Sequence, residues 1–495
     1  MTENMRKFGS YAFDAGHRVL TRNGTLVALG QKSLALLETL LAAEGKSVSK
    51  DDLLQAVWGT TVIEESNLTV QIAALRKALG SKRDGREWIA TVQRFGYQFA
   101  GDDAPTPEAR ASISLAVLPF SNLSADPEQK YFADGLAEDL ITSLSKVPGL
   151  TVIARHSSFA YRDKTADTRE IAKTLGARFL VDGSVRRAGE RVRINAHVTD
   201  AEKGGHIWTD KFDGELKDVF ELQDEVVAKI VKALSTNLPL PKTARQHTPS
   251  IEAYDLFVQG RLFTQSTPEG NRAARPLLER ACALDPDFAE AHGWLAQNLV
   301  FEWLYCYGDD ERLRAHTLAE KAVSLDPDNA DAQIALAYMY IFSSKDLGKS
   351  EEHIRLALQA NPNHADSWLT YSDWHVFSGD ADQAMKYMDK AFQLNPLPHA
   401  IYYWSKSLAL YLGKRYEELA EITKSDIPLS VGLMRNSAAA FAQLGRMDEA
   451  EIWRKRFMER VPQFTISSWI ENLPFRRQRD VDHFIEGYTK AGFPK

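Results

Sequence analysis

One phrase recurs through the C-terminal half of this 495-residue chain and limits its fold more than any other feature. This motif ends in Asp-Pro or Asn-Pro after small and apolar residues, and it occurs at 281–286, 322–327, 357–362 and 391–396. Two degenerate copies end at Pro428 and Pro462. Successive prolines of the series are 41, 35, 34, 32 and 34 residues apart. Proline cannot continue a helix, so each phrase should end one. The regular period predicts stacked helical units, each of which buries its apolar face against the next.

A period near 34 residues resembles that of tetratricopeptide repeats. Gly379 and Ala384, and later Gly445 and Ala450, stand where that repeat needs small residues for close helix contact. The resemblance implies an all-α superhelix over residues 250–495 with a concave groove that binds a protein, a peptide or another copy of the chain. The segment is rich in Trp and Tyr, and we expect most of these rings in the core and the remainder along the groove.

A second informative stretch, residues 67–99, lies near the N-terminus. At 100° per residue, a helix over 67–79 gathers four apolar side chains on one side: Leu68, Ile72, Leu75 and Leu79. Two short runs of alternating apolar residues follow, broken at 94–96, and they predict a β-hairpin. An amphipathic helix of this length is also typical of an ordinary surface helix with a solvated face. The flanking sequence favours the more specific interpretation.

That flanking sequence resembles the C-terminal effector domain of response regulators of the winged-helix type. The resemblance covers about residues 6–100, with short β-segments at 11–13 and 25–29, a helix over 33–43, a turn at 45–50 and a second helix that ends in Trp58-Gly59. It implies an α+β winged helix-turn-helix in which residues 67–79 are the recognition helix and Arg94 to Tyr97 form the wing. It also implies that residues 59–66 are the loop that some relatives offer to RNA polymerase.

A recognition helix presents its side chains to double-stranded DNA. Gln hydrogen-bonds an adenine edge, small apolar groups touch a thymine methyl, and Arg and Lys hold phosphates. Relatives often carry Arg at the positions of Ala73 and Ala74, so phosphate anchoring should be weaker in this chain. The expected DNA-binding residues are Asn67, Thr69, Val70, Gln71, Ala74, Arg76, Lys77, Arg94 and Tyr97.

The charge distribution agrees with a DNA-binding head. Residues 1–100 hold 13 Lys and Arg against 10 Asp and Glu, a net charge of +3. The whole chain carries −7, so the remainder carries −10. Positive charge is therefore concentrated in the segment that should meet phosphate. Because +3 is modest, we expect weak binding by a monomer, which a homo-oligomer or several sites would strengthen.

The middle of the chain, residues 112–238, alternates apolar strands and amphipathic helices, which predicts an α/β layer. Its sequence resembles a module that accompanies some bacterial adenylate cyclases and winged-helix regulators. It also resembles the N-terminal domain of TolB. The residues that carry this likeness lie at 118–120, 131–135 and 181–185. In the cyclase relatives a catalytic domain stands where the winged helix stands in this chain. No paired metal-binding aspartates occur in a cyclase context, so the sequence predicts no cyclase activity.

Other candidate chemistry is sparse. Asp134 and Glu138 share a helix face at a spacing suited to acid–base work, but we interpret Asp134 as a helix cap and Glu138 as solvated. Phosphate-binding loops, zinc-binding His-Glu-x-x-His and nucleophile elbows are missing from the sequence. Cys282 and Cys306 are too few for a disulfide framework and suit a reducing compartment. We therefore expect no enzyme, no metal site and no cofactor.

These observations divide the chain at 101–107 and near 238–249, where prolines and polar residues cluster. The expected domains are 1–103, 112–238 and 250–495. We see no apolar run of membrane-spanning length and no signal peptide, so the expected location is the cytoplasm. The hypothesis is a bacterial transcriptional regulator whose repeats bind an effector or a protein, or self-associate. The alternative is a signalling scaffold or adenylate-cyclase-like protein with incidental DNA binding.

Overall fold

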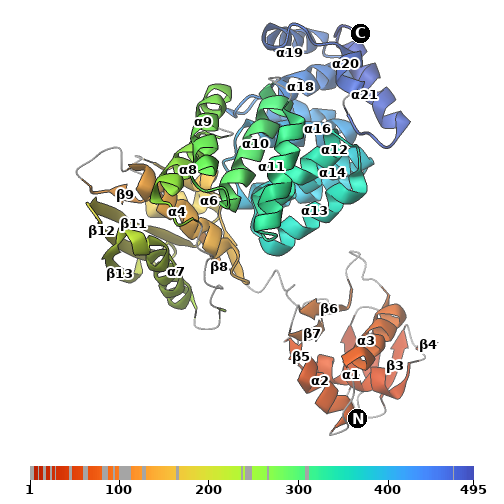
Figure 1. The fold of residues 1–495 in the computed structure, drawn as a ribbon. Coiled ribbons are helices and arrows are strands. Elements are labelled where there is room, and N and C mark those ends of the chain that lie inside the picture. Colours follow the sequence, from red (N-terminus) through yellow and green to blue (C-terminus); the bar gives the residue numbers. More distant parts are fainter. Residues whose placement is uncertain are drawn as a thin grey trace. The chain divides into compact units, whose positions relative to one another are not determined.

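The chain forms two compact units, Met1–Ser112 and Ile113–Lys495, and each is described by itself (Figure 1). The structure is a computed structural model that describes residues 5–8, 11–14, 18–22, 25–27, 29–43, 47–59, 65–80, 87–92, 95–99, 113–124, 130–162, 167–235, 238–239, 248–264, 267–306, 311–471 and 473–495. Within these ranges, no helix combines the length and apolar character needed to cross a bilayer.

The first unit is an α+β winged helix. Four antiparallel strands lead, β1 (Met5–Phe8), β2 (Tyr11–Asp14), β3 (Val19–Arg22) and β4 (Thr25–Leu26). Helices α1 (Gln31–Ala42), α2 (Lys50–Trp58) and α3 (Glu65–Leu79) follow, and β6 (Ile89–Val92) and β7 (Gly96–Phe99) form a hairpin that β5 (Val48–Ser49) joins. The three helices occur where they were predicted. The strands β1 and β3 were missed, and the predicted turn at 45–50 contains β5.

The apolar stripe of α3 packs into the core of this unit. Leu68, Ile72, Leu75 and Leu79 are all buried, together with four leucines of α1: Leu34, Leu37, Leu40 and Leu41. The Tyr11 hydroxyl donates a hydrogen bond of 2.7 Å to the backbone oxygen of Leu79, which fastens the end of α3 to the N-terminal sheet. The periodicity of residues 67–79 therefore predicted correctly which side of α3 faces the protein.

The second unit begins with a six-stranded sheet in the order β10-β8-β11-β12-β13, with β9 paired to β11. Its helices α4 and α7 pack against one face, and α6 covers part of the other. The elements are β8 (Ile113–Val117), β9 (Ser121–Asn122), α4 (Lys130–Ser145), β10 (Leu150–Val152), α5 (Arg155–Phe159), α6 (Thr168–Leu175), β11 (Phe179–Ala188), β12 (Arg191–Asp200), β13 (Gly205–Glu215) and α7 (Val219–Leu234). This α/β layer was predicted, apart from β9 and α5.

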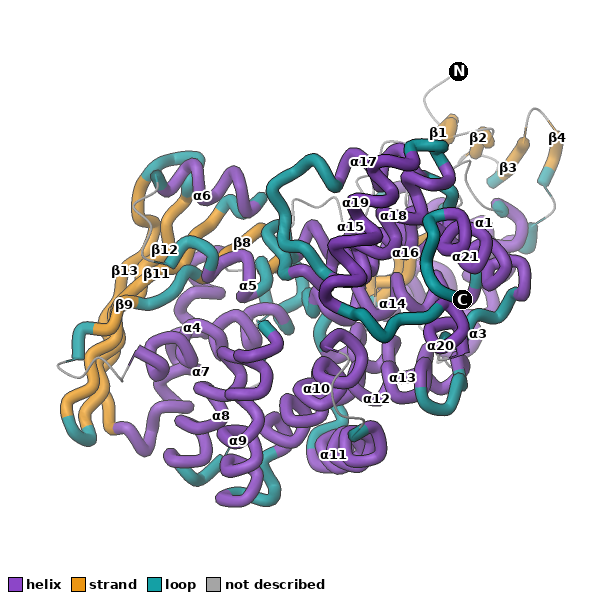
Figure 2. Tube along the Cα trace, turned by 90° about the horizontal axis from the view of Figure 1, so that it is seen from above, coloured by secondary structure: helices purple, strands orange, loops and turns teal. Residues whose placement is uncertain are grey.

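Fourteen helices follow within the described residues and stack as the repeat period predicted (Figure 2). They are α8 (Ile251–Phe263), α9 (Pro268–Leu284), α10 (Ala289–Cys306), α11 (Arg312–Leu325), α12 (Ala330–Phe342), α13 (Leu347–Ala360), α14 (Ala365–Ser378), α15 (Ala381–Leu394), α16 (Ala400–Leu412), α17 (Tyr416–Ile422), α18 (Val431–Gln443), α19 (Met447–Arg460), α20 (Ile466–Glu471) and α21 (Gln478–Lys490). The helices α9, α11, α13 and α15 each end directly before an Asp-Pro or Asn-Pro pair, as expected.

The α/β layer packs against the turns between the repeats. Asn361 Nδ2 donates to Ser145 Oγ at 2.8 Å, and Asn363 Nδ2 donates to the backbone oxygens of Ser145 and Leu150 at 2.8 and 3.0 Å. One repeat further on, Ser157 Oγ donates to Asn395 Oδ1 at 2.6 Å. These hydrogen bonds join the end of α4 and the start of α5 to two successive turns. We call this contact the seam.

Buried charges complete the seam at α8. Arg261 Nε lies 3.0 Å from Glu138 Oε1, and its Nη2 lies 3.2 Å from Asp139 Oδ1. Asp139 also accepts hydrogen bonds from the Tyr254 hydroxyl and from Gln223 Nε2, the latter at 3.1 Å. The interpretation of Glu138 as a solvated residue was wrong, because Arg261, 123 positions later in the chain, neutralises it in the interior.

The expectation for Asp134 was also wrong. Its side chain is buried, and its Oδ1 accepts a hydrogen bond of 2.6 Å from Arg162 Nη2 rather than capping α4. Burial raises the pKa of Asp134, and the Arg162 guanidinium opposes that shift. The acidic pair of α4 therefore holds structure together through arginines on other elements.

The first prediction concerns the charges of the seam. Arg261→Met should lower the free energy of unfolding of residues 113–495 by about 3–5 kcal/mol, because it leaves the buried carboxylate of Asp139 without its cation and leaves Glu138 with Arg155 alone. Arg280→Met on the exposed side of α9 is the matched control and should change it by less than about 0.5 kcal/mol. The measurement is urea unfolding followed by circular dichroism. Equal effects of the two substitutions would contradict the role assigned to Arg261.

A buried carboxyl on α14 makes the repeats sensitive to pH. Asp373 Oδ2 accepts hydrogen bonds from the Tyr338 hydroxyl at 3.2 Å and from Ser405 Oγ at 3.1 Å. Burial raises the pKa of Asp373 to about 7, although both hydrogen bonds oppose the shift. The unfolded chain ionises this group near pH 4. Because the folded chain then holds a proton that the unfolded chain has lost, this group should reduce stability as pH rises from about 4 to 7.

The second prediction follows from the loss of stability with rising pH. Asp373→Asn should raise the melting temperature of the full chain at pH 8, with a gain in stability of at most about 4 kcal/mol at 1.36 kcal/mol per pKa unit. Most of the gain should vanish at pH 5, where the wild-type carboxyl is neutral in the folded chain. The exposed Asp448 offers a control, because Asp448→Asn should shift melting equally little at both values. Identical gains for Asp373→Asn at pH 5 and pH 8 would refute the assignment.

Candidate nucleic-acid interface

The helix α3 presents a surface opposite its buried stripe. Asn67, Thr69, Ala74 and Lys77 are exposed, and Val70 is 62% exposed, the most exposed large apolar side chain of this unit among the described residues. Helix α3 begins at Glu65, two residues earlier than predicted. The surface is mostly small and apolar with one lysine at its C-terminal end, which suits contact with thymine methyl groups more than dense phosphate anchoring.

Gln71 stands at the edge of this surface and is half-buried. Its Oε1 accepts a hydrogen bond of 2.7 Å from Ser33 Oγ on α1. The remaining amide group is a donor, so Gln71 can keep this bond and still donate to an acceptor on a base edge. The expected hydrogen bond between Gln71 and an adenine edge is therefore compatible with the Ser33 bond.

Arg76 has several partners within the first unit. Its Nε and Nη2 donate to the backbone oxygen of Ile89 at 3.0 and 2.8 Å, and Nη2 also donates to Thr91 Oγ1 at 2.7 Å. An ion pair of 2.7 Å with Glu87 completes its partners. These contacts tie α3 to β6, and they favour a structural role for Arg76 over a phosphate contact. The sequence could not show that a backbone oxygen 13 positions away would accept hydrogen bonds from Arg76.

Tyr97 and the wing also differ from expectation. Tyr97 is only 7% exposed and packs in the core of the unit. The turn of the hairpin exposes Phe95 instead, at 49%. Arg94, the expected wing contact, lies outside the described residues, as do residues 60–64 of the loop predicted to meet RNA polymerase.

Gly96 is required at the wing for a reason that the sequence did not reveal. A Cβ atom at this position would lie 1.9 Å from the backbone oxygen of Val48. The strand β5 pairs Ser49 with Gly96, so the two backbones approach too closely for a side chain. Glycine is required here because β5 must approach the hairpin closely.

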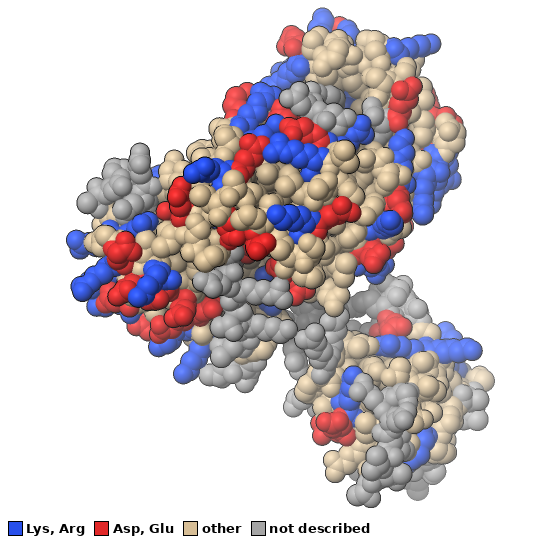
Figure 3. All heavy atoms as spheres, viewed as in Figure 1, with Lys and Arg blue, Asp and Glu red and all other residues tan. Residues whose placement is uncertain are grey.

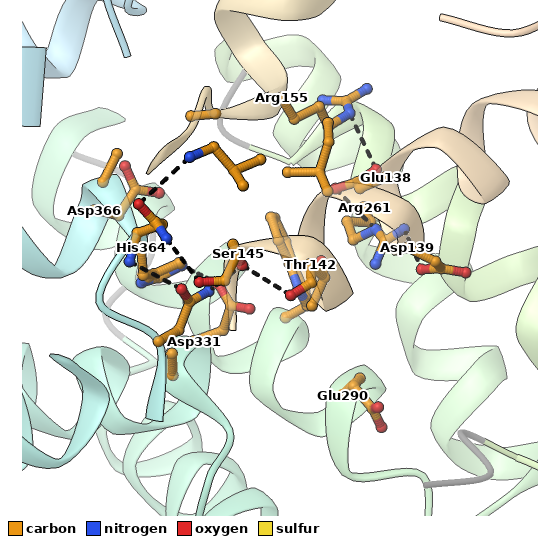
Figure 4. A pocket seen from close by; sticks show the side chains of 18 of the residues that line it. Glu138, Asp139, Thr142, Ser145, Arg155, Arg261, Glu290, Asp331, His364 and Asp366 are labelled. Carbon is orange, nitrogen blue, oxygen red and sulfur yellow. Dashed lines mark hydrogen bonds and ion pairs between the residues drawn. The ribbon is translucent and has the colours of Figure 1, made fainter. Parts of the chain in front are cut away.

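A cavity of about 220 Å³ lies at the seam in the second unit (Figure 4). Glu138, Asp139 and Arg261 line one side, and Asp331, His364 and Asp366 line the other. These groups have partners within the chain. His364 Nε2 lies 3.4 Å from Asp331 Oδ1, and Asp366 accepts a 2.5 Å hydrogen bond from the Tyr402 hydroxyl.

The side chains at the cavity therefore support packing between modules. Among the described residues, no three His, Cys, Asp or Glu side chains are grouped so that they could hold a metal ion. Figure 3 shows positive and negative side chains interspersed over the visible face of residues 113–495, with no large field of one sign on that face. The surface of α3 remains the strongest candidate for a binding site.

Comparisons with known protein families match all three parts of the chain. Residues 24–99 match the family described as transcriptional regulatory protein, C terminal, and residues 111–229 match the second domain of HilA/YgeH-like transcriptional regulators. Residues 365–396 match a tetratricopeptide repeat. The chain contains a winged helix, a HilA-like domain and tetratricopeptide repeats. The predicted fold class is confirmed, and the matched regulator domains support a DNA-binding regulator.

Curated relatives share parts of the chain only. The protein named "Putative adenylate cyclase 3" of Rhizobium meliloti is 48% identical over 196 residues, which cover 39% of this chain and 33% of that protein. The transcriptional regulator HilA of Salmonella typhi is 38% identical over 107 residues, 20% of this chain and 19% of HilA. The transcriptional activator CadC of Escherichia coli is 27% identical over 99 residues, 20% of this chain and 19% of CadC. The chain thus spans a third or less of each.

Solved structures resemble single modules. The DNA-binding domain of Klebsiella pneumoniae RstA, solved with the RstA box, is 30% identical and covers 20% of this chain and 97% of that domain, with a TM-score of 0.18. PilF of Pseudomonas aeruginosa is 17% identical and covers 43% of this chain and 92% of PilF, with a TM-score of 0.32.

The third prediction separates two adjacent cations of α3. Arg76→Ala should lower the stability of fragment 1–112 by about 1–3 kcal/mol, because it leaves the oxygen of Ile89 without its donors. Lys77→Ala should leave stability unchanged, weaken binding to all DNA sequences and reduce the salt dependence by about one ion. Thermal melting and fluorescence titration at three salt concentrations measure the two effects. Equal melting temperatures of the two variants would contradict the structural role of Arg76.

Proposed function

We propose that the chain is a sequence-specific, DNA-binding transcriptional regulator in which α3 enters the major groove. The observation that carries the proposal is the division of α3 into a buried leucine stripe and an exposed surface around Val70 and Ala74. The match of residues 24–99 to regulatory DNA-binding domains supports it. The proposed domains are 1–103 for DNA, 112–238 for the α/β layer and 250–495 for the repeats.

The direct contacts in this proposal come from a short set of residues. Val70 and Ala74 touch thymine methyl groups, Gln71 donates to a base, and Asn67, Thr69 and Lys77 hold the backbone. Arg94 reaches phosphate or the minor groove from the wing. Arg76 and Tyr97 act indirectly, by fixing the hairpin to α3.

Occupancy of DNA depends on the rest of the chain in this proposal. A DNA-binding domain with few cations, residues 1–103, binds DNA weakly as a single copy. Linking two such domains adds avidity without any new contact. The repeats and the α/β layer supply that link by self-association, or they bind a protein or effector that alters it. RNA polymerase contacts residues 59–66, the last two of which begin α3, and the protein works in the cytoplasm, where the DNA is.

A second candidate function is a signalling scaffold or cyclase-like protein with incidental DNA binding. The observation in its favour is the 48% identity shared with the relative named "Putative adenylate cyclase 3". The chain spans only a third of that relative, and the described residues group no metal-binding carboxylates. A regulator is therefore the better-supported proposal.

The fourth prediction tests the DNA-binding surface. Ala74→Asp should weaken binding of the full chain to its target DNA at least tenfold, because it replaces a methyl contact with a base by a carboxylate inside a groove flanked by phosphates. Ala42→Asp makes the same change at an exposed end of α1 and should have no effect on affinity. Target sequences come from genome-wide capture of DNA fragments, followed by titration of the full chain and of fragment 1–112 at one salt concentration.

Three outcomes distinguish the candidates. Weaker, non-cooperative binding of fragment 1–112 to the same targets would support the proposed division of labour. Equal loss of affinity in both aspartate variants would count against α3 as the DNA-binding element. Release of cyclic nucleotide from ATP by the full chain would favour the second candidate.

A further inference from the structure

The strand β13 is the last strand of its sheet and leaves one edge open. It runs for 11 residues, Gly205–Glu215, and pairs with β12 on one side, whereas no described residue pairs with its other side. The strand contains no proline, and alternate residues along it are exposed. Figure 2 shows β13 at the end of the sheet away from the repeat helices. An open edge of this length is a template for pairing with another strand.

The orientation of the backbone shows which residues face outward. In an antiparallel pair, alternate residues turn both backbone groups toward the same neighbour. The Asn195 oxygen lies against Gly183 of β11, where a Cβ atom would approach it to 2.0 Å, so Asn195 faces β11. Its neighbours Ile194 and Ala196 then face β13.

The partners of Ile194 and Ala196 on β13 are Phe212 and Asp210, which therefore face β12. The intervening residues turn their N–H and C=O groups to the open edge. They are Thr209, Lys211, Asp213 and Glu215. In agreement, the Lys211 N–H donates to its neighbour Asp210 Oδ1 at 2.9 Å.

We propose that β13 pairs with β13 of a second copy of this chain, antiparallel, about a two-fold axis that passes through Phe212. The two sheets then form one continuous sheet. Lys211 of each copy lies opposite Asp213 of the other, and Thr209 lies opposite Glu215. These outward-facing pairs supply about eight backbone hydrogen bonds, two for each closely spaced pair. In each copy the Lys211 N–H exchanges its bond to Asp210 Oδ1 for one of them.

Charge favours this register over the others centred on residues 210–214. Residues that face each other across an antiparallel pair lie on the same side of the sheet, so the two-fold axis must pass through a residue. An axis through Asp210, Lys211 or Asp213 sets that charge against itself. An axis through Gly214 sets Asp213 against Glu215. The axis through Phe212 avoids like charges and creates two Lys211–Asp213 pairs.

Both charged groups are available on the open face of the sheet. The side chains of Lys211 and Asp213 are 54% and 49% exposed and lie 3.3 Å apart within one chain. Arg193 of β12 also donates to Asp213, at 2.6 Å, and holds the pKa of Asp213 below its usual value. The carboxylate is therefore fixed and ionised where the second copy would present its lysine.

This surface gives a location to the self-association in the proposed function, and rests on that function only for its link to DNA. A two-fold dimer contains two DNA-binding domains. Both can bind DNA together, which compensates for the few cations of each domain. The assembly itself follows from the edge of the sheet and can be tested without DNA.

The experiment compares full-length wild-type protein with Lys211→Asp and Asp213→Lys by sedimentation equilibrium. The wild type should be a dimer at micromolar concentration. Each variant should weaken the dimer at least tenfold, because each homodimer faces like charges twice. An equimolar mixture of the two variants should restore the dimer, since one copy then carries two aspartates and the other two lysines. Lys490→Asp on the exposed end of α21 is the control and should leave the dimer intact.

Restoration on mixing is the decisive result, because a defect within one chain cannot be repaired by a second chain. Circular dichroism of each variant should match that of the wild type. A monomeric wild type, a dimer indifferent to both variants, or a mixture that stays monomeric would each overturn the proposal. DNA titration of the same samples is read separately: intact dimers without DNA binding would overturn the proposed function and leave this interface standing.

Discussion

A single carboxylate holds much of the larger unit in place. Asp139 on α4 is buried and binds Arg261 and Tyr254 of α8 and Gln223 of α7. An ionised group in the interior is costly unless its partners are positioned with it, so the helices that supply them must keep their mutual arrangement. The repeats thus begin on a helix that is already fixed to the α/β layer. Every later helix pair stacks on that start.

The last residues of the repeated motif differ between copies, and the difference coincides with contacts to the α/β layer. The first two copies end in Asp-Pro, and the next two end in Asn-Pro. The amides of those two, Asn361 and Asn395, hydrogen-bond to Ser145 and Ser157 of the α/β layer. An amide both donates and accepts without carrying charge, which suits a partly buried contact. The change from Asp to Asn marks the turns that meet another module, although the sequence alone gave no reason to notice it.

Periodic features were predictable, and long-range partners were not. The leucine stripe of α3, the repeat period and the order of strands and helices follow from spacing along the chain, and the structure agrees with them. The partners of Gln71 and Arg76 cannot be read from spacing along the chain. Their side chains reach Ser33 Oγ and the oxygen of Ile89 only once the unit has folded. The acidic pair of α4 was misjudged for the same reason. Its burial depends on arginines at positions 155, 162 and 261, which no local pattern connects to it.

The seam also decides where the chain can be recombined. Residues 113–495 share one compact unit, and the hydrogen bonds of Asn363 and Asn395 run directly between its two modules. A chimera cut at the proline-rich stretch near 240 would separate donors from acceptors on both sides and expose the buried carboxylates of α4. A chimera cut between residues 101 and 112 would exchange one compact unit for another. The α/β layer and the repeats must therefore be inherited together, whereas residues 1–112 form a compact unit of their own.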